Sequence, residues 1–207
     1  MGVLLTTARL ILRRFTAADA DYLFALDNDP AVMRYINGGT PTPRRVIEAE
    51  ILPRFMRYDE RYPGYGFWAA EEKAGRAFLG WFSFRPTQDR PGELALGYRF
   101  RQAVWGRGYA SEGARALIDK GFTEWGVACV VAGTYEENLA SRRVMEKVGL
   151  TFRRAFRPSA AEILNSETSH ITSAEVWEGD EVEYALERAE WEGKVDRVNT
   201  NHDFQAR

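Results

Sequence analysis

Two glycines between a strand-like and a helix-like segment constrain the fold of this chain more than any other feature. Residues 94–100 are typical of a strand. The segment of residues 105–114 holds Gly106 and Gly108 and leads into apolar residues at helical spacing: Ala114, Leu117, Ile118 and Phe122. Such glycines let the backbone turn tightly and approach a ligand. The helix start offers free N–H groups and the positive end of the helix dipole, so it suits a phosphate, and Arg107 adds a mobile positive charge.

Two known phosphate loops do not account for this segment. A P-loop needs Gly-Lys-Ser/Thr, which does not follow. The dinucleotide fingerprint fails because the third glycine is misplaced and no acidic residue ends a next parallel strand. A lone Gly-x-Gly is most simply an ordinary turn, so a second motif has to decide.

That second motif is residues 138–150, with the sequence NLASRRVMEKVGL. Together the two segments resemble the GNAT superfamily of acyl-CoA-dependent N-acyltransferases, within it the ribosomal-protein N-terminal (alanine/serine) acetyltransferases. The resemblance covers residues 5–191. It implies a single-domain α/β fold with a mixed, mostly antiparallel twisted sheet, a central split and helices on both faces.

Composition is that of an ordinary single domain of 207 residues, which we assign to residues 1–191, with a polar tail at 192–207. The net charge of −2 gives no pull toward nucleic acid or anionic membrane. The single cysteine, Cys129, excludes an intramolecular disulfide, and its apolar neighbours indicate a buried small residue. Two histidines far from both motifs disfavour a metal site or a histidine triad. No leader or membrane span is evident, so we expect a cytoplasmic protein.

Alternation and helical spacing predict the order of elements along the chain. We expect strands at residues 6–14, 66–71, 77–84, 94–100, 127–134, 150–156 and 182–186. Helices are expected after Thr16, at 30–35, at 44–58 with an interruption at Pro53, after the glycine loop and at 140–147. Residues 158–180 are an irregular excursion and 195–207 a frayed tail.

The resemblance implies that acetyl-CoA is the co-substrate and that its pyrophosphate lies over the loop amides. The implied cofactor-binding residues are Tyr98, Phe100, Arg101, Val104, Trp105, Gly106, Arg107, Gly108, Tyr109, Ala110, Asn138, Ser141, Arg143 and Lys147. The family pattern begins with Gln or Arg, where this chain has Ala103, and Arg101 or Gln102 compensates. Asn138 is a helix N-cap that also contacts the pantetheine. Arg142, Arg143 and Lys147 are either a solvated face or, through Arg143 or Lys147, a site for the 3′-phosphate.

The sequence indicates the catalytic residues less clearly than the cofactor site. The tyrosine that many family members use to protonate the leaving CoA thiolate is Met145 here, so the resemblance implies Ser141, with Tyr135 as a rival donor. The alternative is that the Ser141 hydroxyl only satisfies a backbone group at the start of its helix. The branch's carboxylate before Gly97-Tyr98 is replaced by Ala95. Glu93 lies on the same strand face, about 6.6 Å away, and is our candidate general base, directly or through water, unless it is merely a solvated strand-start residue.

These features predict an acetyl-CoA-dependent N-acetyltransferase that transfers acetyl directly to a primary amine, either a protein N-terminal α-amine or a small-molecule amine. The apolar setting of Cys129 disfavours an acyl-enzyme. The alternative is an acyl-CoA-binding sensor or scaffold with little catalysis, which would tolerate Ala95, Ala103 and Met145. We expect no metal, no nucleic-acid or membrane partner, and a homodimer.

Overall fold

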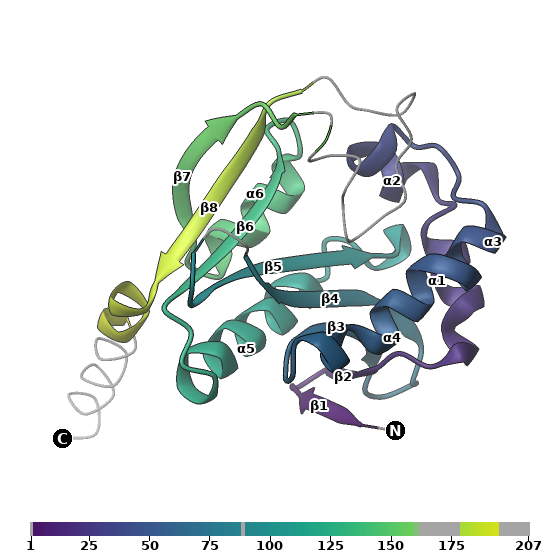
Figure 1. Cartoon of the computed structure of the whole chain (residues 1–207), viewed down its shortest axis with the longest axis horizontal. Coiled ribbons are helices and arrows are strands. Elements are labelled where there is room, and N and C mark those ends of the chain that lie inside the picture. The colour runs from purple at the N-terminus through teal and green to yellow at the C-terminus, as the bar shows by residue number, and fades with distance from the viewer. Residues whose placement is uncertain (1, 88–89, 160, 162–178, 195–207) are drawn as a thin grey trace.

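A single sheet forms the centre of the molecule in the computed structural model, which describes residues 2–87, 90–159, 161 and 179–194 (Figure 1). Its eight strands lie in the order β1-β2-β3-β4-β5-β6-β8-β7. Among the described strands, β5 and β6 form the one parallel pair, and the other neighbours are antiparallel. The strands are β1 (Val3–Thr6), β2 (Leu10–Arg14), β3 (Gly66–Glu72), β4 (Phe78–Pro86), β5 (Glu93–Phe100), β6 (Cys129–Tyr135), β7 (Thr151–Phe156) and β8 (Glu181–Glu187). The predicted α/β fold with a mostly antiparallel sheet is confirmed.

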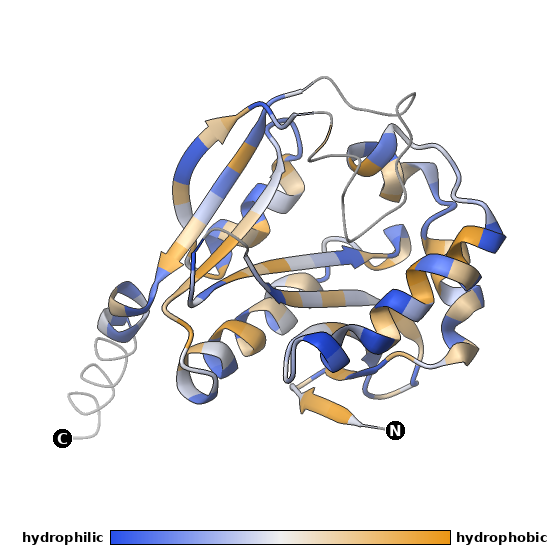
Figure 2. Cartoon of the chain, in the orientation of Figure 1, coloured by the Kyte–Doolittle hydropathy of each residue, from blue (hydrophilic) through white to orange (hydrophobic). Residues whose placement is uncertain are grey.

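Helices cover both faces of this sheet because its central strands are apolar on both sides. Phe82 and Phe84 of β4 share one core with α5 (Tyr109–Glu124), whereas Trp81 belongs to a second core on the other face. A Cβ on Gly113 or Gly121 would lie 2.4 or 2.6 Å from the rings of Phe82 and Phe84, so these glycines let α5 pack closely on the sheet. Hydrophilic and hydrophobic residues interleave along the helices (Figure 2), as expected for helices with one buried face. The second core includes residues of α1 (Ala20–Leu26), α2 (Pro30–Asn37), α3 (Arg44–Val46), η2 (Ile47–Ile51) and α4 (Leu52–Arg61); η1 (Ala17–Asp19) precedes α1.

The sheet splits between β5 and β6. The two strands pair only through Glu93, Leu94 and Ala95, opposite Cys129, Val130 and Val131. Beyond these residues β6 continues to pair with β8 as far as Tyr135, while β5 continues along β4 as far as Phe100. The outer halves of β5 and β6 therefore diverge, which confirms the expected central split.

Three details differ from the sequence expectations or fall outside the described residues. The strand expected at residues 6–14 is confirmed at Leu10–Arg14, but residues 7–9 are a turn: β1 and β2 form a hairpin, because the Thr7 hydroxyl accepts from the Leu10 amide and closes that turn. The helix expected at 44–58 contains a π-helical turn, η2, just before Pro53, a residue that cannot donate a helix hydrogen bond. Most of the 158–180 excursion and all of 195–207 lie outside the described residues, whereas residues 188–194 are helical. The division at residue 191 stays a prediction.

Candidate active site

The loop between β5 and α5 has the backbone conformation that its glycines allow. A short helix, η3 (Gln102–Val104), follows β5, and Gly106 and Gly108 then have φ of 72° and 81°. Other residues adopt this left-handed region at an energetic cost. Gly108 is the N-cap of α5 and contributes no capping side chain. The structure places Arg101, Val104, Trp105, Gly106, Arg107, Gly108, Tyr109 and Ala110 together in this loop and the first turn of α5.

The amides of this loop are open to a ligand. Within the described residues, the N–H groups of residues 106–111 have no hydrogen-bond acceptor, and the first helical bond of α5 runs from the Glu112 amide to the Gly108 carbonyl. The glycines and Arg107 are exposed. A row of free donors at the positive end of a 16-residue helix is a site for an anion. Trp105 closes the loop on its strand side, because its indole N–H donates to the Phe100 carbonyl at 2.8 Å. The Phe100 ring itself is buried in the core.

Tyr98 and Ser141 meet across the split. The Tyr98 hydroxyl lies 2.9 Å from Ser141 Oγ and also donates to the Ser141 carbonyl at 3.1 Å. Tyr98 belongs to the outer half of β5, and Ser141 to α6 (Leu139–Lys147), which follows β6. Burial raises the pKa of Tyr98 well above its usual value, and the hydrogen bond with Ser141 only partly offsets this effect. The two hydroxyls therefore stay protonated at neutral pH.

The first turn of α6 is capped by the side chain of Asn138. Asn138 Oδ1 accepts from the Ser141 amide at 3.2 Å, and Asn138 Nδ2 donates to Thr134 Oγ1 at 3.0 Å. The N-cap role expected for Asn138 is confirmed. Met145, about two helical turns after Asn138, is 1% exposed and packs in the main core.

The basic residues of α6 separate into two groups. Arg142 donates to the Tyr184 hydroxyl at 3.0 Å and to the Glu136 carbonyl at 3.0 Å, so its guanidinium braces the fold. Arg143 and Lys147 are exposed and lie one helical turn apart. Of the three residues, these two remain available to a ligand.

The rival proton donor, Tyr135, is buried at the end of β6, opposite Glu181 of β8. Burial, together with the charge of Glu181, raises its pKa to about 12. The structure links Ser141 to Tyr98 by hydrogen bonds, whereas Tyr135 pairs with Glu181 of β8.

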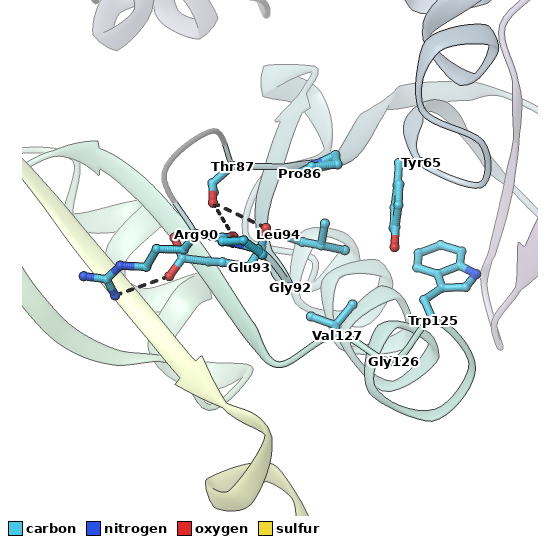
Figure 3. A pocket seen from close by; sticks show the side chains of 11 residues that line it. Tyr65, Pro86, Thr87, Arg90, Gly92, Glu93, Leu94, Trp125, Gly126 and Val127 are labelled. Carbon is cyan, nitrogen blue, oxygen red and sulfur yellow. Dashed lines mark hydrogen bonds and ion pairs between the residues drawn. The ribbon is translucent and has the colours of Figure 1, made fainter.

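The candidate base, Glu93, lies in the paired half of β5 and is held by arginines. It is 8% exposed; its Oε2 accepts from Arg153 Nη1 at 2.8 Å, and Arg90 Nη1 lies 3.7 Å away. Glu93, Arg90, Tyr65 and Trp125 line a pocket of about 220 Å³. Figure 3 shows how their side chains lie around it. Sequence reasoning missed Arg153, because a bulge in β7 between Phe152 and Arg154 turns its side chain toward Glu93, and no residue pattern announces that bulge.

Cys129 lies beside the same arginine. Arg153 Nη2 donates to its Sγ at 3.1 Å, and burial, with the nearby charge of Glu187 adding to the effect, raises the pKa of the thiol to about 12. A thiol in this state is a poor nucleophile at neutral pH. Among the described residues, no group of three or more potential ligand side chains is placed to hold a metal ion, and no helix is both long and apolar enough to cross a membrane.

Comparison with known proteins gives the family. The profile of the acetyltransferase (GNAT) domain matches residues 9–151. An Aspergillus fumigatus protein, FsC-acetyl coenzyme A-N(2)-transacetylase, is 32% identical over 195 residues, covering 90% of this chain and 77% of the relative. The uncharacterized protein YkkB of Bacillus subtilis is 36% identical over 155 residues, covering 74% of this chain and 88% of the relative.

A solved structure shares the fold. RimL, a ribosomal L7/L12 alpha-N-protein acetyltransferase in complex with coenzyme A, superposes with a TM-score of 0.70 at 17% identity, covering 90% of this chain and 98% of that one. Taken with the glycine loop, the split sheet and the two helix starts that face it, these matches confirm the resemblance seen in the sequence. The chain belongs to the GNAT acetyltransferase family and is an N-acetyltransferase.

Proposed function

We propose that this enzyme binds acetyl-CoA at the β5–α5 loop and transfers its acetyl group directly to a primary amine in the split. The observation that carries the proposal is the row of open amides at residues 106–111, next to the place where β5 and β6 diverge. A pyrophosphate would satisfy these donors. Pantetheine would then run along the outer half of β5, from Arg101 toward Tyr98, as an added strand. The raised pKa of Cys129 supports direct attack without an acyl-enzyme.

The exposed residues of α6 complete the cofactor site in this proposal. Arg143 and Lys147 are the residues for the 3′-phosphate, since Arg142 is committed to Tyr184 and Glu136. The second N–H of the Asn138 amide is assigned to the pantetheine, because its first is used by Thr134.

Ser141 is the proposed donor to the leaving thiolate, and Tyr98 orients its hydroxyl. If Tyr98 donates to Ser141 Oγ, the Ser141 proton is free to point into the split; if Tyr98 donates to the Ser141 carbonyl, that proton points at Tyr98 instead. A proton relay from Tyr98 through Ser141 would replace the proton that the sulfur takes. Tyr135 remains the rival donor.

Glu93 is the proposed acceptor of the amine proton, acting through ordered water. Because Arg153 already occupies Oε2 of Glu93, this assignment suits an amine that is partly neutral at pH 7 and therefore asks less of its base. An α-amino group, with a pKa near 8, meets this condition better than a lysine or polyamine, with a pKa above 10. The names of the two proteins, an N(2)-transacetylase and an alpha-N-protein acetyltransferase, agree with that class of acceptor.

We further propose that the enzyme is a cytoplasmic homodimer.

The test is an acceptor screen. Purified protein is mixed with acetyl-CoA and a panel of peptides with free N-termini, amino acids, polyamines and amino sugars, and thiol release and the mass of the acetylated product are followed. We expect turnover with an α-amine. Tight acetyl-CoA binding without thiol release from any amine would favour the sensor or scaffold alternative.

A further inference from the structure

Arg9 reaches the cofactor loop from the far end of the sequence. It lies in the turn between β1 and β2, and its side chain packs on the start of α5. Its Nε donates to Glu112 Oε2 at 2.6 Å, and its Nη1 donates to the carbonyl of Arg107 at 2.9 Å. The guanidinium also lies 4.6 Å from the centre of the Tyr109 ring. Three groups of the loop and helix start thus fix one guanidinium in place.

The carboxylate that holds Arg9 is itself tightly held. Glu112 Oε1 accepts from the Thr7 hydroxyl at 2.6 Å and from the Arg9 amide at 2.8 Å. Partial burial alone would favour its neutral form, but the hydrogen bonds from Thr7 and Arg9 outweigh burial and lower the pKa of Glu112. Glu112 is therefore an anion at neutral pH, in the first turn of a helix whose open end faces the loop.

An anion in that place would repel a bound pyrophosphate unless a cation neutralised it. Arg9 neutralises Glu112 and still has N–H groups that donate to no acceptor in the described residues. Its Nη2 has no hydrogen-bond partner within the described residues, and this atom lies 3.4 Å from the point where a Cβ on Gly108 would stand. Thr7, Arg9, Gly108, Ser111 and Glu112 line the same open groove, of about 440 Å³. The unused N–H groups of Arg9 therefore lie beside the open loop amides.

We propose that Arg9 is a cofactor-binding residue, whose guanidinium, fixed by Glu112 and the Arg107 carbonyl, contacts a phosphate of CoA beside Gly108. The inference rests on the proposed function, because it takes the loop to be the pyrophosphate site. It adds a residue from the β1–β2 turn to that site, and it gives Glu112 the role of positioning Arg9. A charge-assisted contact with phosphate is among the stronger hydrogen bonds in proteins.

The experiment compares Arg9→Gln with Arg45→Gln, which removes an equal charge from an exposed residue of α3. CoA affinity is measured by calorimetry at several salt concentrations, and turnover is measured with acetyl-CoA and with S-acetylpantetheine, which lacks the nucleotide phosphates. For Arg9→Gln we expect about 10- to 100-fold weaker CoA binding and a smaller salt dependence. Turnover at saturating acetyl-CoA and kcat/KM with S-acetylpantetheine should match the wild type, and Arg45→Gln should change none of these.

Two results would overturn the inference. One is an unchanged CoA affinity in Arg9→Gln. The other is an equal loss with S-acetylpantetheine, which would mean that Arg9 only braces the fold. Arg9→Lys keeps the charge but cannot serve Glu112 and Arg107 together, so it should bind CoA with intermediate affinity and serves as the second variant if Arg9→Gln does not fold. A wild-type protein that does not bind CoA would instead remove the proposed function itself, and this inference with it.

Discussion

Two helices begin at the same split, and the free amides of their first turns are treated differently: those of α5 have no capping side chain, whereas α6 has one. α5 starts at Gly108 with no capping side chain, and the amides of residues 106–111 have no acceptor in the described part of the chain. α6 starts at Asn138, whose side chain accepts from the Ser141 amide. Helix N-termini need partners for their free donors, from side chains, water or a ligand. The two helix starts therefore differ in what they offer a ligand: the open start of α5 has a row of free amides that suits an anion, whereas the capped start of α6 offers mainly its side chains.

Gly108→Glu tests the open start and should have the largest effect. A side chain here would be strained at φ 81° and would carry a negative charge into the anion's place beside Arg9. We expect CoA binding to weaken at least about 100-fold, by calorimetry, with the fold retained. Gly64→Glu is the matched control, because Gly64 has φ 88° and open space around it outside the loop. An unchanged CoA affinity in Gly108→Glu would remove the pyrophosphate from this loop.

Ser141→Ala tests the capped start. Loss of a general acid typically costs about 10²-fold or more, so we expect kcat to fall about 10²-fold while CoA affinity changes little. If Tyr98 acts through Ser141, Tyr98→Phe should lower kcat alone but add no further loss in the Ser141→Ala background. Additive losses, read from the same steady-state kinetics, would show that Tyr98 acts independently. A larger fall in kcat for Tyr135→Phe than for Ser141→Ala would identify Tyr135 as the donor.

The sequence predicted the open start of α5 and the cap on α6 because both are local. The role of Gly106 and Gly108 depends only on their own φ angles, and the capping role of Asn138 depends only on the first turn of its own helix. Contacts between distant segments are different in kind. Tyr98 meets Ser141 across the split, and Arg9 of the β1–β2 turn meets Glu112 of α5. Both depend on how distant elements come together, which no short segment of the sequence indicates.

Glu93 shows how far a strand pattern alone can mislead about chemistry. Alternation correctly puts Glu93 and Ala95 on one face of β5. It gives no sign that Arg153, at a bulge in β7, contacts Glu93, so that an apparently free carboxylate is half of a partly buried ion pair. The base is therefore the least predictable part of the site.

Glu93→Gln tests whether the paired half of β5 takes part in the chemistry at all. Because Oε2 of Glu93 is occupied by Arg153 and Glu93 would act through water, we expect a loss of about 10-fold at pH 7, below the usual range for a general base. The loss should shrink toward pH 9, since an acceptor amine with a pKa near 8 is then already neutral. The measurement is the pH–rate profile at saturating acetyl-CoA. Glu187→Gln is the control, because Glu187 also contacts Arg153, at 3.1 Å, and should leave the profile unchanged. A wild-type profile in Glu93→Gln would make this carboxylate structural.

Asn138→Ala removes the cap that distinguishes the two helix starts. Loss of an N-cap costs about 1 kcal/mol, and the proposed pantetheine contact is lost with it. We expect an increase in KM for acetyl-CoA of about 5-fold and a small decrease in Tm. Asn138→Asp keeps the accepting oxygen but not the donor, so it should restore Tm without restoring KM. Equal recovery of both by Asn138→Asp would show that the residue is a cap and nothing more.

Met145→Tyr should have the smallest effect on activity, although it restores the residue that many family members use as the acid. Met145 is 1% exposed in the core between α6 and the sheet, so a phenol there faces packed side chains rather than the split. Overpacking costs about 1–3 kcal/mol, which corresponds to a Tm about 2–12 °C lower for a domain of this size. We expect kcat within about 2-fold of the wild type, whereas Met145→Leu, which nearly conserves volume, should change neither kcat nor Tm appreciably. A tenfold rise in kcat for Met145→Tyr would mean that position 145 reaches the sulfur after all, and that Ser141 at the capped start of α6 is not an adequate donor.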